Sequence, residues 1–162
     1  MTMAYIIDGN NFLGFAHPGQ HRDPENRMAL VRKLLAFRKF TGSRVVLVFD
    51  GRVSDDLAAL AGGEEKFRVL QPPQGESADD VIRGLIDRQK DRRRLFVVSS
   101  DREIRSYARE AGARPLPCRD FAAALKGALR ERKTLKEMDK PEPRASSMEL
   151  GLWLEVFGDR RR

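Results

Sequence analysis

Three short apolar segments of the chain are each followed, within three residues, by an aspartate. The pairs are Ala4–Ile7 with Asp8, Arg44–Phe49 with Asp50, and Leu95–Val98 with Asp101. If these segments are strands of an open α/β sheet, their acids gather beyond the carboxyl ends, where such sheets carry functional groups. Clustered carboxylates repel one another unless cations compensate them, and Mg²⁺ or Mn²⁺ suits such an oxygen-rich set. The pattern therefore predicts a metal site at that edge of the sheet.

A fourth acid stands in a predicted helix that begins near Ser77. At 100° per residue, Asp79 lies at the edge of the apolar stripe of this helix, where it can reach a cleft beside the sheet. Asp80 lies nearly opposite the stripe and three residues after Ser77, as the acidic partner in a capping box does. We therefore add Asp79 to the predicted site and leave Asp80 out. Glu76, just before the helix, could supply a more distant ligand.

The overall charge indicates what such a site would act on. The 162 residues include 31 Lys and Arg against 24 Asp and Glu, which gives a net charge of +7. Guanidinium groups bind phosphate oxygens, so a basic, arginine-rich surface suits a nucleic acid. A divalent ion held by carboxylates activates water and stabilises the charge that develops on a phosphoryl group. An aspartate cluster in such a chain predicts metal-dependent cleavage of phosphodiester bonds.

The elements that must position these acids alternate between strand-like and helix-like patterns. Continuous runs of β-branched and aromatic residues indicate strands covered on both faces, and helical apolar stripes lie between them. Alternation of this kind predicts a three-layer α/β sandwich, with a mostly parallel sheet and helices on both faces. The five expected strands are Ala4–Ile7, Arg44–Phe49, Phe67–Gln71, Leu95–Val98 and Arg114–Leu116.

Size and composition restrict the class of protein. The length fits one ordinary domain. No apolar run approaches the ~18–20 residues of a membrane helix, and the first residues do not resemble a signal peptide. We therefore expect a cytoplasmic protein that acts away from membranes. The single cysteine, Cys118, excludes an internal disulfide framework and a cysteine-based zinc site.

Towards the C-terminus the composition changes. A charged stretch leads to Pro141-Glu142-Pro143, which breaks any helix. Ser146 and Glu149 then form a capping-box pair ahead of a short amphipathic pattern. We predict that residues 1–137 form the nuclease domain. Residues 138–162 would then hold a tether, a short amphipathic helix and a basic tail. The helix would either dock on the domain or engage a partner. Its apolar positions are Leu150, Trp153, Leu154 and Phe157.

Four short motifs occur in order at the predicted strand ends and helix start. They are Asp8-Gly9-Asn10-Asn11, Phe49-Asp50-Gly51, Glu76-Ser77-Ala78-Asp79 and Ser99-Ser100-Asp101. Together they resemble the NYN domain in its YacP-like branch, which belongs to the PIN-like nucleases related to flap endonucleases. The likeness runs from about Ala4 to Leu129. The tail, with Lys140-Pro141 and the segment 153–158, resembles the same branch.

This resemblance implies a Rossmann-like sheet of strand order 3-2-1-4-5 and a metal-dependent endoribonuclease that uses Mg²⁺ or Mn²⁺. Asn11 matches the polar residue that positions a carboxylate or a phosphate, and Ser100 matches the hydroxyl beside the last acid. The residues carried over as the catalytic and metal-binding set are Asp8, Asp50, Asp79 and Asp101.

Four arginines follow strand ends or lie in the long loop after the first motif, so we expect them to grip RNA near the acids. They are Arg22, Arg27, Arg52 and Arg102. The same loop carries His17 and His21, whose role stays open, because Pro18 and Gly19 prevent a regular helix from placing both on one face. The expected partner is RNA, alone or within a ribosome or an RNA-processing assembly. The preference for RNA over DNA, the number of ions and the oligomeric state stay open.

Two other functions are weighed against the nuclease. A non-catalytic RNA-binding module of the same fold would not need the intact acidic set, and it is kept as the alternative. A phosphotransfer receiver needs paired acids just after the first strand and a lysine after a later one. The first strand here is followed by Asp8-Gly9-Asn10-Asn11, and no suitable lysine appears. The receiver is therefore set aside.

Overall fold

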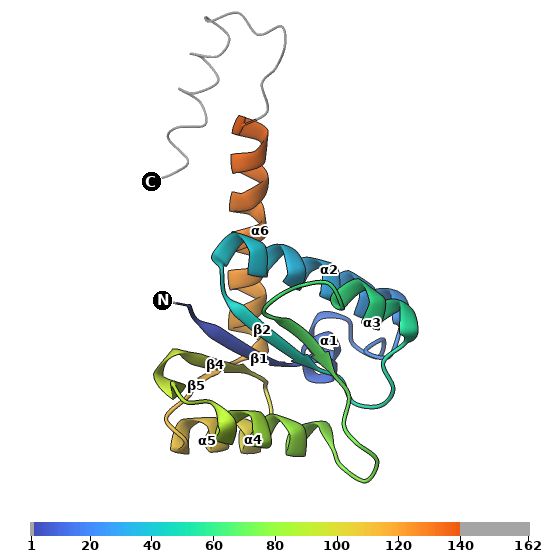
Figure 1. Cartoon of the computed structure of the whole chain (residues 1–162), viewed down its shortest axis with the longest axis vertical. Coiled ribbons are helices and arrows are strands. Elements are labelled where there is room, and N and C mark those ends of the chain that lie inside the picture. Colours follow the sequence, from blue (N-terminus) through green and yellow to red (C-terminus); the bar gives the residue numbers. More distant parts are fainter. Residues whose placement is uncertain (1, 140–162) are drawn as a thin grey trace, which may run out of the picture. The chain divides into compact units, whose positions relative to one another are not determined.

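A computed structural model describes residues 2–139 and shows a five-stranded parallel sheet with helices on both faces (Figure 1). Neighbouring strands pair in parallel in the order β3-β2-β1-β4-β5. The predicted α/β fold class and strand order are therefore confirmed. The strands are β1 (Ala4–Asp8), β2 (Arg44–Val48), β3 (Phe67–Leu70), β4 (Leu95–Val98) and β5 (Arg114–Leu116).

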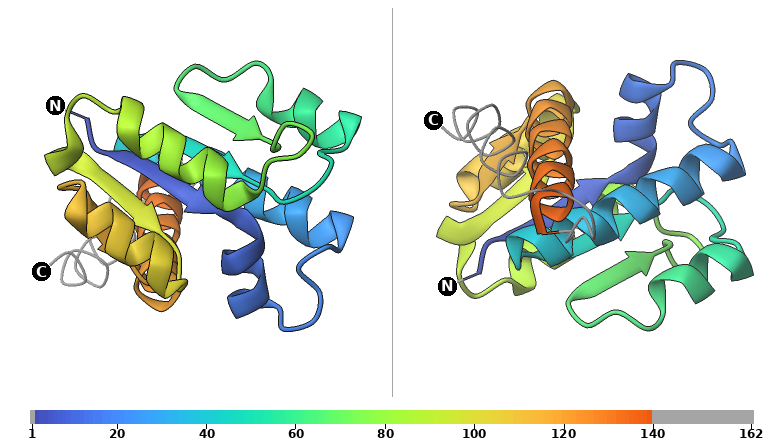
Figure 2. Two further views of the ribbon diagram at one scale, coloured as in Figure 1. Left: turned by 90° about the horizontal axis from the view of Figure 1, so that it is seen from below. Right: turned by 90° about the horizontal axis from the view of Figure 1, so that it is seen from above.

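The helices divide between the two faces of the sheet. Figure 2 shows α4 and α5 over the face seen from below, and α2 with the first part of α6 over the face seen from above. The helices are α1 (Gly9–Ala16), α2 (Pro24–Thr41), α3 (Asp55–Ala61), α4 (Ala78–Arg88), α5 (Arg102–Glu110) and α6 (Cys118–Asp139), with a short 3₁₀ helix η1 (Arg92–Arg94) before β4.

Two apolar clusters fill the space between the sheet and these helices. Successive residues of β1 point to opposite faces, as strand geometry requires. Ile7 belongs to the larger cluster, with Phe12 of α1 and Phe121 of α6. Ile6 belongs to the second cluster, with Ile82 of α4 and other residues of α5. Because β1 is covered on both sides, its carboxyl end is held rigidly at the centre of the sheet.

The sequence patterns did not predict α1 or α3. α1 begins directly after β1, because the side chain of Asp8 caps its first turn. Gly9 is required there by close packing, since a Cβ at this position would lie 2.7 Å from the ring of Phe49 and 3.0 Å from the carbonyl oxygen of Val48. The first motif is therefore a tight strand-to-helix junction that rests against the end of β2.

The chain divides into two units between Glu131 and Arg132. The amphipathic helix around Trp153 and the basic tail lie outside the described residues, and the proposed division at residue 137 stays a prediction. Within residues 2–139, no helix is long and apolar enough to cross a membrane.

Candidate active site

Asp8 stands at the centre of the carboxyl edge of the sheet, and only 7% of it is exposed. One of its carboxylate oxygens accepts a hydrogen bond from the backbone N–H of Asn11 (3.4 Å), and the other accepts one from the hydroxyl of Ser99 (3.3 Å). Burial, together with the charges of Asp79 and Asp101, raises the pKa of Asp8 to about 6, although the hydrogen bonds from Asn11 and Ser99 oppose this rise. The ionised form of Asp8 is therefore disfavoured in the fold unless a cation lies nearby.

Asp101 is linked to Asp8 through one buried hydroxyl. The backbone N–H of Asp101 donates to the Oγ of Ser99 (3.1 Å), and the same hydroxyl donates to Asp8. The carboxylate of Asp101 caps α5, because it accepts hydrogen bonds from the N–H groups of Glu103 (2.8 Å) and Ile104 (3.4 Å). The position of this acid is therefore fixed both by its helix and by Ser99.

Asp79 and Asp80 are neighbours in sequence with opposite environments. Asp79 is half-buried, and burial followed by the charge of Asp101 raises its pKa, while Arg83 one turn later lowers it. Asp80 is exposed and forms the predicted capping box, in which its carboxylate accepts from the N–H of Ser77 (3.1 Å) and its own N–H donates to the hydroxyl of Ser77 (3.1 Å). These hydrogen bonds lower the pKa of Asp80. The predicted separation of the two acids by helical geometry is confirmed.

Asp50 lies apart from the other three acids in its contacts. It is exposed in the turn after β2, where its N–H donates to the side-chain oxygen of Asn10 (3.0 Å) and its carbonyl accepts from Arg27 (3.0 Å). Gly51 completes the turn with a φ of +80°, a conformation that glycine adopts without strain. The charges that raise the pKa of Asp8 are those of Asp79 and Asp101. Arg27 instead contacts Asp50 through the backbone carbonyl, and the charge of Asp50 is the smallest of three influences on the pKa of that arginine.

Arg27 is built into the domain by hydrogen bonds to other parts of the chain. Its guanidinium donates to the carbonyl oxygens of Asp50 and of Arg52 (3.2 Å) and to the side chain of Asn10 (3.4 Å). It also lies 4.5 Å from the centroid of the Phe49 ring. Burial lowers the pKa of Arg27, and the nearby charge of Arg22 adds to that effect. By contrast, Arg22, Arg52 and Arg102 are exposed.

Asn11 joins three segments that are distant in sequence. Its side-chain oxygen accepts hydrogen bonds from the N–H of Ser100 (2.7 Å) and from the thiol of Cys118 (3.1 Å). The N–H of Cys118 in turn donates to the hydroxyl of Ser100 (3.4 Å). Burial raises the pKa of the Cys118 thiol, so it keeps the proton that it donates. Ser100 therefore helps to fix the loop, while Ser99 is the serine whose hydroxyl touches a carboxylate.

The donor set fits a divalent cation in chemistry, although no three Asp, Glu, His or Cys side chains within residues 2–139 lie as a closed metal cage requires. Mg²⁺ is usually held by one or two carboxylates and completed by waters and substrate phosphates. The oxygen-only group formed by Asp8, Asp79 and Asp101 suits that mode. Glu76 is exposed and is not among the charges that raise the pKa of Asp8 or Asp79.

The sequence patterns did not predict a role in the site for four residues that lie near the acids. They are Asn10, Arg83, Ser99 and Cys118. Asn10 and Ser99 stand inside the quoted motifs, and Arg83 lies four residues after Asp79, a helical spacing that signals an ion-pair neighbour. His17, whose role was left open, ends α1 as its C-cap residue.

Comparison with known families decides the relationship. The chain matches the model of the YacP-like NYN domain over residues 5–152. It belongs to this family. This YacP-like NYN domain is also similar to two solved structures of Rae1 (YacP) from Bacillus subtilis, each with a TM-score of 0.65. The W164L mutant has 23% identity over 88% of this chain and 87% of that one, and the other structure has 20% identity over 99% and 93%. A comparison with curated proteins finds no match.

At these identities, the likeness to the two solved structures shows the fold alone. The family itself is nuclease-related, which supports a nuclease in general terms for this YacP-like NYN domain. Its acids lie where that class of fold carries functional groups, at the carboxyl ends of parallel strands.

Proposed function

We propose that this chain is a divalent-metal-dependent endoribonuclease that cleaves RNA phosphodiester bonds at the carboxyl edge of its sheet. The observation that carries the proposal is the buried Asp8, which Ser99 links to Asp101 and whose pKa the charges of Asp79 and Asp101 raise. A fold that holds three carboxylates where they disfavour one another's charge is typical of a functional site. A divalent cation is the partner that would relieve this cost.

The acidic residues would divide the work of binding. Asp8, Asp79 and Asp101 would hold Mg²⁺ or Mn²⁺, which when bound activates water and stabilises charge on a phosphoryl group. Ser99 would keep Asp8 and Asp101 in register through its two hydrogen bonds. Asp50, in its separate loop, would complete the acidic wall with Glu76 further out.

The remaining residues would bind and orient the RNA. Arg22, Arg52 and Arg102 are exposed near the carboxyl edge, so they would contact phosphates. Asn11 and Ser100 would support the site by fixing the loop that carries Asp101. We propose RNA as the substrate in the cytoplasm, free or within a ribosome or an RNA-processing assembly.

Labelled RNA and matched DNA, incubated with Mn²⁺, Mg²⁺ or EDTA, test this proposal. Wild type should cleave RNA in either metal and lose the activity in EDTA. Asp101→Asn should abolish cleavage, because Asn still caps α5 but removes a charged oxygen ligand. Asp80→Asn is the matched control, since it makes the same change one residue beyond Asp79 on the exposed side of α4.

A second function becomes the better account if the measurements disagree. Asp101→Asn that cleaves RNA as fast as wild type, or cleavage that persists in EDTA, would rule out this mechanism. If wild type does not cleave RNA and both variants still bind it, the results would favour the non-catalytic RNA-binding module.

A further inference from the structure

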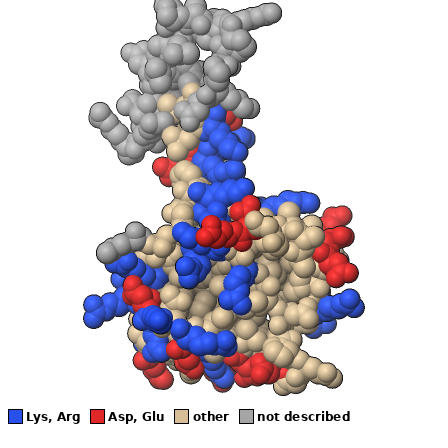
Figure 3. All heavy atoms as spheres, viewed as in Figure 1, with Lys and Arg blue, Asp and Glu red and all other residues tan. Residues whose placement is uncertain are grey.

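A cavity of about 480 Å³ opens at the amino ends of the strands, on the opposite edge from the acids. Four cationic side chains line it: Arg44 at the start of β2, Lys66 just before β3, Arg68 in β3 and Arg88 at the end of α4. We refer to this cavity as the cationic pocket. Figure 3 shows Lys and Arg side chains gathered over the half of the domain where, in Figure 1, the N-terminus and the end of α4 lie.

The positive charge of the cationic pocket is largely uncompensated. Glu64 also lines it, but its carboxylate is paired with Arg38 (3.8 Å) and Lys39 (3.3 Å) of α2. Glu65 is then the one remaining acid of the lining, against four cations. Among residues 2–139, none of the four cations forms an ion pair, and all four are exposed. An anion placed there would meet cations that no carboxylate neutralises, of which Arg88 also donates through its Nε to the carbonyl oxygen of Gly84 (3.1 Å).

The floor of the cationic pocket is apolar. Val46 of β2 and Leu85 of α4 are half-buried and offer accessible apolar surface, and the buried Ile6 and Leu95 complete the lining from β1 and β4. Pockets of a few hundred Å³ with an apolar lining and a few charged groups are typical of sites for small ligands. An inorganic anion would leave this floor unused, whereas a nucleotide would cover it with its base and direct its phosphate to the cations.

The rim of the cationic pocket includes a backbone conformation that is unfavourable for its residue. Lys66 has a φ of 64°, which side chains other than glycine rarely adopt. Its carbonyl oxygen accepts a hydrogen bond from the N–H of Val45 (2.9 Å), so the strand pairing holds it in place. Residues kept in such conformations cluster at ligand sites. Here the conformation places an ammonium group at the pocket.

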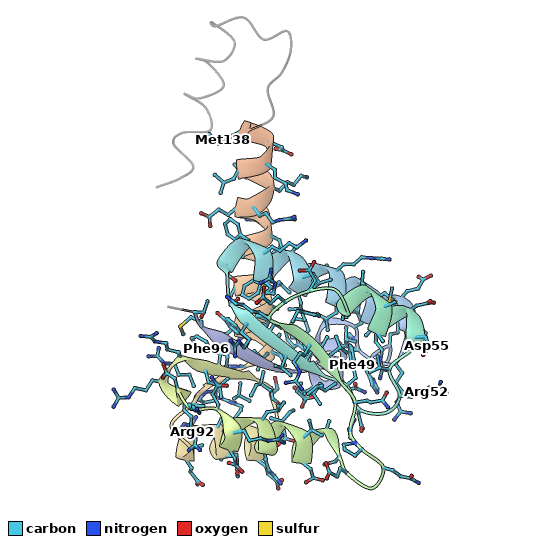
Figure 4. All side chains as sticks on the ribbon, viewed as in Figure 1. Phe49, Arg52, Asp55, Arg92, Phe96 and Met138 are labelled. Atoms are coloured by element: carbon cyan, nitrogen blue, oxygen red, sulfur yellow. The ribbon has the colours of Figure 1, made fainter. Side chains whose placement is uncertain are left out.

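We propose that the cationic pocket binds the phosphate of a nucleotide, with the base on the apolar floor. Ala4 at the amino end of β1 and Asp8 at its carboxyl end are four residues apart, which is about 13 Å, so one phosphate cannot contact the cations at the amino edge and the acids together. Figure 4 shows the same division, with Phe49 and Arg52 at one edge of the sheet and Arg92 towards the other. The nucleotide belongs either to a bound RNA strand or to a free nucleotide. This site does not depend on the nuclease activity.

Binding of adenosine monophosphate and of a short labelled single-stranded RNA tests the proposal, with the full chain in EDTA. The double variant Arg44→Gln/Arg68→Gln should raise the dissociation constant of each ligand by at least about tenfold, because charge-assisted contacts are lost. Arg32→Gln/Arg109→Gln removes the same charge from exposed positions on α2 and α5, and should change affinity less than twofold, by about the screened long-range effect alone. Arg88→Gln alone, at an exposed helix end, serves if the double variant unfolds.

The outcomes separate the two sources of the phosphate. Loss confined to the RNA assigns the site to an RNA strand, loss confined to adenosine monophosphate assigns it to a free nucleotide, and loss of both supports a shared site. Equal weakening in the pocket and control variants, or no weakening in either, overturns the proposal. Competition by inorganic phosphate as strong as that by adenosine monophosphate overturns the role of the base.

Discussion

The carboxyl edge of the sheet holds its acids in two different ways. Around β1 and β4, the charges of Asp79 and Asp101 raise the pKa of Asp8, and the charge of Asp101 also raises that of Asp79. Beyond β2, Asp50 is exposed and lies beside Arg27, which donates to its backbone. In the first group, carboxylates lie close enough to disfavour ionisation, whereas Asp50 stands apart in a turn that Arg27 holds through a backbone carbonyl. Equivalent strand-end aspartates in the sequence are thus unequal in the fold.

The largest expected effect separates these two groups by cleavage rate. Asp8→Asn should slow metal-dependent RNA cleavage by about a hundredfold or more, because an electrostatic contact to the reacting centre is lost. Asn retains the cap of α1, so the fold should survive. Asp50→Asn should slow cleavage by only about tenfold, since Asp50 is exposed in a separate turn and its charge is not among those that raise the pKa of Asp8. Single-turnover rates at saturating Mn²⁺ measure both.

Equal losses in Asp8→Asn and Asp50→Asn would break the comparison. They would mean that the RNA or the metal draws the Asp50 loop into one site with the other acids. Circular dichroism and RNA binding in EDTA serve as controls, because both variants should fold and bind RNA at least as well as wild type.

The second effect is the pH dependence of stability without metal. The folded pKa of Asp8 is raised from 3.8 to about 6, so the folded state holds the proton more tightly than the unfolded state. The stability linked to this proton is full below about pH 4 and is lost as the pH rises through about 6. The difference corresponds to about 3 kcal/mol. Denaturant unfolding in EDTA should show it as a gain of Asp8→Asn over wild type that grows from pH 4 to 7.

Mn²⁺ supplies the control for this second effect. At pH 7 the metal should stabilise wild type by mass action, and it should stabilise Asp8→Asn much less, because a ligand is missing. A constant difference between the two proteins from pH 4 to 7 would show that the charge of Asp8 costs nothing in the fold.

The comparison also explains which features were predictable from the sequence. Strand runs and helical stripes are local patterns, so the sheet, the capping box at Ser77 and the separation of Asp79 from Asp80 could be predicted. The link between Ser99 and Asp8 spans 91 residues, and that between Asn11 and Cys118 spans 107. Such contacts exist only after β1, β4 and α6 have come together, and no local pattern encodes them.

Arg27 illustrates the same limit. Its place in a polar loop region suggested an RNA contact, but its side chain lies over Phe49 and donates to the turn that carries Asp50. The packing of α2 against the end of β2 decides this, and a residue-by-residue reading of charge cannot show it. Whether Arg27 also touches RNA stays a prediction, and the turn it holds suggests a different role.

The third effect, smaller again, tests that role. Arg27→Lys keeps the charge but cannot reproduce the fork that reaches two carbonyls and Asn10. We expect a loss of about 1 kcal/mol in unfolding free energy, because the hydrogen bonds of the fork and part of its contact with the Phe49 ring are lost. Cleavage should slow by a few fold. The salt dependence of RNA binding should stay unchanged, because no phosphate contact is removed. Arg22→Lys, at an exposed neighbouring position, should leave stability unchanged. Unchanged stability in Arg27→Lys with a shallower salt dependence would instead assign Arg27 to the RNA.

The smallest expected effect concerns the two adjacent acids of α4 and differs in sign. In EDTA at pH 7, Asp79→Asn should stabilise the protein slightly, because the carboxylate is half-buried and lies near the charge of Asp101. Asp80→Asn should destabilise it slightly, because the ionised carboxylate accepts the N–H of Ser77 in the capping box and Asn accepts it less strongly. Denaturant midpoints for the two variants measure the difference. Mn²⁺ should make wild type more stable than Asp79→Asn, since the metal binds tightly only where the acid remains. Two shifts of the same sign without metal would mean that Asp79 is not held against the other acids, and the group around Asp8 would then reduce to Asp8 and Asp101.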